Sequence, residues 1–180
     1  PVVFTHHTMY EHFTQYVPLD SPRMKRFAIE LASGYADLCD AVIAPSKTIA
    51  EILRGRDIKT RIEVIPTGVD VDLFSNGQGN RFRSAHDIPS DAIVLGQVGR
   101  LAPEKNLEFL TRSLVKQAAS NSRIHVVVVG EGPQEQLFHE RFSSAGILDR
   151  VHLVGTLDGL RLADAYRAMT VFAFASKTET

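Results

Sequence analysis

The stretch IVLGQVGRLAPEKNLEFLTRSLVKQAASNSRIHVVVV, residues 93–129, decides the fold. It begins and ends with short apolar runs that are typical of strands, and the segment between them has the length and spacing of a helix. We predict strands over Ile93–Val98 and Ile124–Val129 and a helix over Leu107–Ala119. Because the second strand is apolar except for His125, we expect it to be buried on both faces of a parallel sheet.

The same alternation of strand-like and helix-like segments continues on both sides of this stretch. Further strands are expected at Val2–Thr5, Ala41–Ala44, Ile62–Ile65, Val151–Val154 and Val171–Ala175. Further helices are expected at Arg23–Cys39, Lys47–Arg56, Gln134–Ser144 and Leu160–Met169. Ser46 is a good N-cap for the second of these helices. Such alternation indicates an α/β fold made of parallel units, in two pieces that are each doubly wound.

The boundary between the two pieces is expected where the pattern weakens. Residues 75–80, Ser-Asn-Gly-Gln-Gly-Asn, form the most loop-like stretch of the chain. We therefore divide the chain into a first domain over residues 1–70, a linker over 71–91 and a second domain over 92–180. Because the chain begins and ends close to expected strands, we interpret it as a fragment with both halves incomplete.

Composition and charge exclude several classes of protein. Hydrophobic residues make up 44% and charged residues 23%, which is typical of a globular chain, and the formal net charge of −1 gives no basic excess for nucleic acid. Cys39 is the single cysteine, so neither an intrachain disulfide nor a cysteine-rich metal site is expected. No apolar run approaches the ~18 residues of a membrane helix. We expect a cytoplasmic protein.

The loop over residues 98–106, Val-Gly-Arg-Leu-Ala-Pro-Glu-Lys-Asn, is the most informative motif. It joins an expected strand to a helix that we expect to start near Lys105, so it lies at the sheet edge where parallel α/β proteins bind ligands. Arg100 and Lys105 offer a planar fork and a point charge, which suit phosphate oxygens, beside a helix N-terminus. The alternative is that two exposed cations occur in this loop by chance.

A glycine-containing turn, residues 130–133 (Gly-Glu-Gly-Pro), follows the most apolar strand. It begins like a dinucleotide-binding fingerprint, but the third glycine of that motif is replaced by Glu135. Its glycines allow a tight turn and close approach of the backbone to a ligand or to a neighbouring element. A structural turn and a binding loop remain equally good interpretations.

Other motifs give little support to metal or nucleophilic chemistry. Asp70 and Asp72 could hold a divalent cation, but no further carboxylates cluster near them. His6 and His7 follow the first strand and, being adjacent, cannot both face one cleft. A nucleophile elbow and a P-loop are absent from the sequence.

Taken together, four segments resemble the retaining nucleotide-sugar glycosyltransferases of family 4, which have two facing Rossmann-like domains (the GT-B fold). The segments, which occur in the same order between the expected strands, are Ile65–Asp70, Val98–Asn106, Val129–Pro133 and Ser176–Glu179. Residues 5–11, Thr-His-His-Thr-Met-Tyr-Glu, further resemble members that glucosylate diacylglycerol-type lipids.

The resemblance implies roles for particular residues. Arg100 and Lys105 match the pair that holds the donor diphosphate, and Glu179 matches the first glutamate of an E-x7-E motif that contacts the donor sugar. His7 matches a histidine that projects into the cleft near the transferred sugar, and Leu157 lies where the backbone meets the nucleotide base. The implied catalytic residues are His7, Arg100, Lys105 and Glu179; the implied donor-binding residues are Gly99, Arg100, Lys105, Gly130, Leu157 and Glu179.

The resemblance also implies an activity. A hexose would pass from a UDP- or GDP-sugar to a lipid or glycan acceptor with retention of configuration, without a metal or other cofactor and without nucleic acid. Arg23, Lys25 and Arg26 could favour peripheral contact with the inner face of the membrane, although a solvated helix face explains them as well. Because the second glutamate of E-x7-E falls beyond residue 180, we expect little activity from this chain alone, and self-association through open sheet edges. The alternatives are a non-catalytic nucleotide-sugar-binding module and a nucleotide-sugar epimerase.

Overall fold

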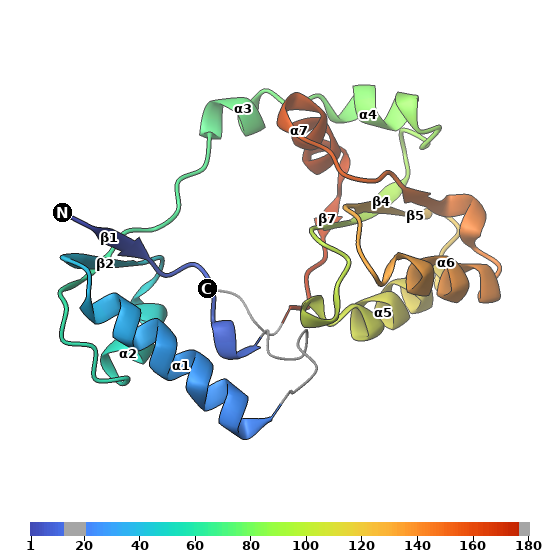
Figure 1. Cartoon of the computed structure of the whole chain (residues 1–180). Helices are drawn as coiled ribbons and strands as arrows, with labels where there is room; N and C mark the ends of the chain where they lie inside the picture. The colour runs from blue at the N-terminus through green and yellow to red at the C-terminus, as the bar shows by residue number, and fades with distance from the viewer. Residues whose placement is uncertain (13–20, 177–180) are drawn as a thin grey trace. The chain divides into compact units, whose positions relative to one another are not determined.

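The computed structural model describes residues 1–12 and 21–176, which fall into two compact units (Figure 1). The first contains Pro1–Val69, and the second begins at Asp70 and takes in the remaining described residues. Each unit has its own sheet and its own apolar core. Among the described residues, no helix is long and apolar enough to cross a membrane.

The first unit is a three-stranded parallel sheet with the strand order β1-β2-β3. The strands are β1 (Val3–Thr5), β2 (Ala41–Ala44) and β3 (Ile62–Val64). Helix α1 (Pro22–Asp37) precedes β2, and helix α2 (Lys47–Arg54) connects β2 to β3. Parallel pairing follows from these helical connections, because a parallel neighbour requires a crossover instead of a tight hairpin.

Both helices of the first unit begin at a serine that caps them. The Ser46 hydroxyl accepts a hydrogen bond from the Ile49 N–H at 3.2 Å, which confirms the predicted N-cap of α2. Ser21 caps α1 in the same way through the Met24 N–H at 3.2 Å. The buried core beneath them consists of Met9, Ala36, Val42, Ala44, Ile49, Ala50 and Leu53.

The apolar stripe that predicts α1 is exposed in the structure. Phe27, Leu31, Tyr35 and Leu38 are all more than half exposed, and Leu38 reaches 82%. The single buried residue of α1 is Ala36. Helical spacing therefore predicts this helix correctly. The side chain that it buries in the described core of the first unit is that of Ala36, which is not part of the apolar stripe.

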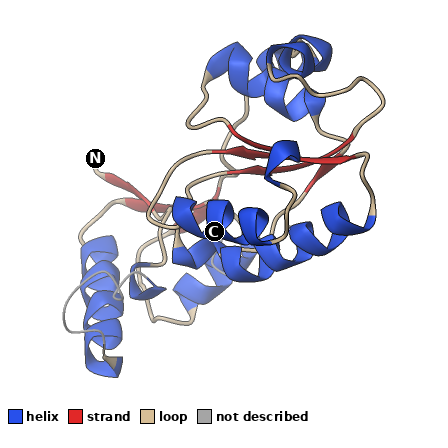
Figure 2. Ribbon diagram, turned by 90° about the vertical axis from the view of Figure 1, so that its right-hand side faces the viewer, coloured by secondary structure: helices blue, strands red, loops and turns tan. Residues whose placement is uncertain are grey.

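The second unit is a four-stranded parallel sheet with the order β6-β5-β4-β7. Its strands are β4 (Ile93–Val98), β5 (Ile124–Val129), β6 (Val151–Leu153) and β7 (Val171–Phe172). Figure 2 shows helices on both sides of this sheet. All six residues of β5 are buried, including His125, which confirms the prediction of a strand covered on both faces.

Each face of this sheet has its own core. On one face, α5 (Leu107–Ser120) and α6 (Glu135–Ser144) pack over a cluster that includes Phe138 and Phe142. The other face is covered by a cluster to which α4 (Gly79–Ala85) and α7 (Gly159–Ala168) contribute. The predicted α/β fold with two parallel sheets is confirmed.

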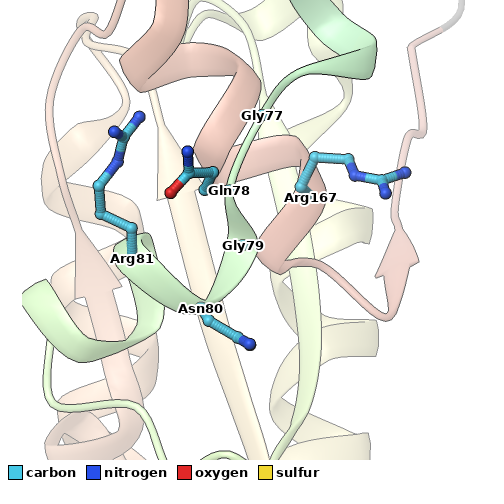
Figure 3. Close-up of a pocket in the computed structure, with 6 residues that line it drawn as sticks. All are labelled: Gly77, Gln78, Gly79, Asn80, Arg81 and Arg167. Carbon is cyan, nitrogen blue, oxygen red and sulfur yellow. The ribbon is translucent and has the colours of Figure 1, made fainter.

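The stretch predicted as a linker, residues 71–91, carries two short helices that belong to the second unit. Helices α3 (Val71–Ser75) and α4 pack against α7, and Phe82 and Ile88 are buried in the core there. The glycines that suggest a loop permit this packing: a Cβ on Gly79 would lie 2.3 Å from the carbonyl oxygen of Arg167 (Figure 3). The close approach of two backbones therefore explains the glycines of this segment.

Candidate functional site

The carboxyl ends of the strands of the second unit bring two of the sequence motifs, residues 98–106 and 130–133, together with the loop after β6. Main-chain hydrogen bonds tie these loops to one another, because the Gly99 N–H donates to the Val129 carbonyl at 3.0 Å and the Leu101 N–H donates to the Glu131 carbonyl at 2.9 Å. The loop after β6 joins them through a bond from the Gly130 N–H to the Gly155 carbonyl at 2.7 Å. The three loops form one continuous rim.

A hollow of 310 Å³ opens at this rim. It is lined by Val98, Gly99, Arg100, Val129, Gly130, Glu131, Thr156, Leu157 and Leu162. Its volume is at the lower end of the range of small-molecule sites. Four of the predicted donor-binding residues, Gly99, Arg100, Gly130 and Leu157, thus lie around one cavity at the predicted edge of the sheet.

The backbone turn at Gly130 has no room for a side chain. Its φ is +122°, and a Cβ there would lie 2.2 Å from the carbonyl oxygen of Gly99. Any other residue would separate the loop after β5 from the loop after β4. The turn is therefore structural, because it lets two loops approach closely. It also lines the hollow, so it can serve as a binding loop as well.

Arg100 supplies positive charge to the lining of the hollow. Its side chain is 57% exposed, and Nη1 lies 3.9 Å from Oε1 of Glu104, whose side chain is nearly buried. The separation of these two atoms exceeds hydrogen-bond distance. An anion in the hollow would find the planar donor fork that suits phosphate oxygens.

Lys105 does not line the hollow. It ends a 3₁₀ turn, Pro103–Lys105, and α5 begins only at Leu107, because Asn106 takes a left-handed conformation with φ +53°. The Lys105 ammonium lies 5.9 Å from the centroid of the Phe174 ring, within cation–π range. The helix thus begins at the predicted Leu107, two residues after Lys105, and the two predicted phosphate-binding cations have different surroundings.

The segment after β7 is joined to the loop after β4. The Ser176 hydroxyl donates to the Glu104 carbonyl at 3.2 Å, and the Asn106 amide donates to the Ala175 carbonyl at 3.1 Å. This places the start of the predicted donor-binding tail beside the loop that carries Arg100 and Lys105. Glu179, the predicted sugar-contacting residue, lies outside the described residues.

In the first unit, the two adjacent histidines after β1 differ in burial. His6 is 1% exposed, neither ring nitrogen has a hydrogen-bond partner, and burial lowers its pKa. His7 is exposed. Met9 and Glu11, both buried, fix the chain just beyond, and the Arg56 guanidinium bonds to the Glu11 carboxylate. His7 is thus the histidine of this pair that a ligand can reach.

The carboxylates considered for a metal have a structural explanation in part. Asp70 caps α3 by accepting a hydrogen bond from the Leu73 N–H at 2.9 Å, and Asp72 lies in the first turn of that helix. Across residues 1–12 and 21–176, no three His, Cys, Asp or Glu side chains are grouped so as to hold a metal ion.

Several lining residues were not among those predicted, notably Glu131, Thr156 and Leu162. Glu131 belongs to the glycine-containing turn identified in the sequence, and Thr156 immediately precedes the predicted Leu157. Because every loop at the carboxyl edge of a parallel sheet faces the same crevice, the residues beside a predicted one are candidates too. Leu162, within α7, had no such signal.

Two family models match the chain, one over each part. The Glycosyltransferase Family 4 model matches residues 1–73, and the model described as Glycosyl transferases group 1 matches residues 79–180. The second match covers more than half of the chain and includes all three loops around the hollow.

Curated relatives match the chain over much or all of its length. Alpha-monoglucosyldiacylglycerol synthase of Streptococcus pneumoniae is 28% identical over 188 aligned residues, which cover 100% of this chain and 42% of the relative. D-inositol 3-phosphate glycosyltransferase of Stackebrandtia nassauensis is 32% identical over 78% of this chain and 34% of the relative. The chain therefore spans less than half the length of these two relatives.

Solved structures agree with the fold. The structure of HepE from Anabaena in complex with UDP and glucose superimposes with a TM-score of 0.75 at 22% identity, over 98% of this chain and 46% of that one. At this level of identity the likeness concerns the fold, and it extends over nearly every residue of both units.

Proposed function

Because the chain belongs to the glycosyl transferases group 1 family, we propose that the protein transfers a hexose from a UDP- or GDP-sugar to a lipid or glycan acceptor. The observation that carries the proposal is the 310 Å³ hollow at the carboxyl edge of the second sheet. It combines a guanidinium at one position with apolar side chains and open backbone at others, which suits a ligand that has a charged part and a flat heterocyclic part.

Departure of the sugar leaves negative charge on a nucleoside diphosphate. Arg100 lines the hollow, and we assign it to the stabilisation of that charge as it develops. Lys105 shares its loop and would act as a second cation if its ammonium leaves the Phe174 ring for the diphosphate. The nucleoside would then lie toward Leu157.

The roles of two further residues follow from the family resemblance. We assign Glu179 to the sugar hydroxyls and His7 to the transferred sugar, which it would help to orient toward the acceptor. The side chain of His7 is exposed, whereas that of its neighbour His6 is buried, and this supports the assignment of His7. With two cations in place of a metal ion, the proposed reaction is metal-independent, and it is retaining as in the family that the motifs resemble.

The acceptor proposal rests on the relatives, one of which is named for a diacylglycerol glycolipid and another for an inositol phosphate. For a lipid acceptor we propose peripheral contact with the inner face of the membrane. Helix α1 supports such contact, because Arg23, Lys25 and Arg26 stand beside the exposed Phe27 and Leu31.

Calorimetric titration with UDP, GDP and ADP tests the donor site directly. We expect UDP or GDP to bind to the chain, and Arg100→Ala to weaken that binding by about 1.5–3 kcal/mol through the loss of charge-assisted hydrogen bonds. Lys116→Ala is the matched control, because it removes an exposed cation from α5 that does not line the hollow. Equal affinities for wild type, Arg100→Ala and Lys116→Ala would remove Arg100 from the site.

A further inference from the structure

Glu131 is the acidic side chain in the lining of the hollow, and it connects two of the loops there. Its Oε1 accepts a hydrogen bond from the Thr156 N–H at 3.3 Å. The same oxygen lies 3.1 Å from the position that a Cβ on Gly155 would occupy. The carboxylate from the loop after β5 is therefore packed against the start of the loop after β6.

The backbone of Glu131 connects the third loop. Its carbonyl accepts from the Leu101 N–H at 2.9 Å, so one residue bonds to the loop after β4 through its main chain and to the loop after β6 through its side chain. Next to it, the Gly130 N–H holds the Gly155 carbonyl. In the part of the chain that the structure describes, two hydrogen bonds join the Gly155–Thr156 segment to the loop after β5: this main-chain bond and the bond to the Glu131 side chain.

The Glu131 side chain is exposed, so burial does not determine which residue occupies this position. Glu131 lines the same hollow as Arg100, and a negative charge there opposes the binding of any phosphate that approaches it. A function as a hydrogen-bond acceptor explains the residue. The carboxylate fixes the Thr156 N–H on the side of the hollow formed by Thr156 and Leu157. Its negative charge would keep a phosphate away from that side.

We propose that Glu131 is a positioning residue for the nucleoside part of the donor. By holding the Thr156 N–H it keeps the Thr156–Leu157 segment in the conformation that receives the nucleoside, while the diphosphate lies against Arg100. The inference rests on the proposed donor site. Without this acceptor the segment has to be ordered when the ligand binds, and the affinity falls by the cost of that ordering.

Titration of Glu131 variants with two ligands tests the proposal. The ligands are the nucleoside diphosphate that binds wild type more tightly, UDP or GDP, and inorganic pyrophosphate. Glu131→Ala removes the acceptor, and Glu131→Asp keeps the charge but shortens its reach. Both are expected to bind the nucleotide about tenfold more weakly, while Glu131→Gln keeps an acceptor oxygen and stays within about threefold of wild type. Pyrophosphate affinity is expected to fall in none of them.

Glu140→Ala is the matched control, since it removes an exposed carboxylate on α6 that accepts a hydrogen bond from the Gln136 side chain. It should leave the affinities for the nucleotide and for pyrophosphate unchanged. Thermal melts followed by circular dichroism establish which variants are folded. If Glu131→Ala is not folded, Glu131→Asp takes its place. Wild-type affinity for the nucleotide in Glu131→Asp and Glu131→Ala overturns the inference and leaves the donor site standing. A parallel loss of pyrophosphate affinity also overturns it. If wild type binds neither UDP nor GDP, the proposed function fails and the inference falls with it.

Discussion

Helices α1 and α5 have nearly the same apolar spacing and opposite environments. In α5 the residues Leu107, Leu110, Leu114 and Ala118 are at most 5% exposed and face the core of the second unit. In α1 and its C-cap the residues Phe27, Leu31, Tyr35 and Leu38 are between 52% and 82% exposed. Spacing therefore predicts a helix and its apolar face, whereas the burial of that face depends on which other parts of the chain pack against it.

A matched pair of leucine substitutions gives the largest difference between the two helices. Leu114→Ala removes a side chain that is 3% exposed, and we expect a loss of about 2–5 kcal/mol in the free energy of unfolding of the second unit. Leu31→Ala removes one that is 62% exposed, so its effect should stay within about 0.5 kcal/mol.

Urea unfolding followed by far-ultraviolet circular dichroism measures both variants, and the m-value shows whether each transition still reports the same unit. A cost above about 1.5 kcal/mol for Leu31→Ala would mean that the stripe on α1 is covered in solution, for example by a second copy of the chain. In that case the loss should depend on protein concentration.

The elements themselves could be predicted with few errors because each strand and helix carries a local signal. Strands β2, β4 and β5 have the expected bounds, and Ser46 caps α2 as expected. Residues 71–91 carried no such signal. Their helices are short, and Gly79 is required by contact with α7, a partner more than 80 residues further along the chain.

The residues of the candidate site also fall into those that could be placed from sequence and those that could not. Gly99, Arg100, Gly130 and Leu157 could be placed together from sequence, because loops that follow neighbouring parallel strands meet at one edge. The different surroundings of Lys105 could not be predicted, since they depend on the left-handed Asn106 and on the side chain of Phe174. Glu131 was part of a quoted motif, but its bond to Thr156 needs the register of β5 against β6.

Two histidines on neighbouring strands, His125 in β5 and His152 in β6, make the stability of the second unit depend on pH. Nδ1 of His125 and Nε2 of His152 lie 3.1 Å apart, and burial lowers both pKa values, that of His152 to about 4. The unfolded chain, with a histidine pKa near 6.5, therefore binds more protons than the folded one between these values. Stability should be complete above about pH 6.5 and fall as the pH drops toward 4, by on the order of 2 kcal/mol.

Unfolding of wild type and His152→Gln at a series of pH values measures this effect. The variant should lose much of the dependence between pH 6.5 and 4, while His139→Gln, which removes a histidine from α6 that is exposed, should keep it. A wild-type stability that is flat over this range would contradict the assignment of two neutral rings, one buried and one half-buried.

The smallest effect concerns how the two helices begin. Helix α1 has a serine cap in Ser21, whereas the N-cap of α5 is Asn106, whose side chain makes no capping bond. An exposed helix depends more on such local bonds than a packed one, because burial contributes little to it. Ser21→Ala should therefore destabilise α1 by about 1 kcal/mol and speed amide exchange along it about fivefold.

Ser113→Ala on α5 is the control, because that hydroxyl donates to the Phe109 carbonyl one turn earlier in the helix and does not cap it. Equal exchange rates in Ser21→Ala and wild type would show that α1 is held by contacts along its length and not by its cap, which would bring it closer to α5 than the exposure of its stripe suggests.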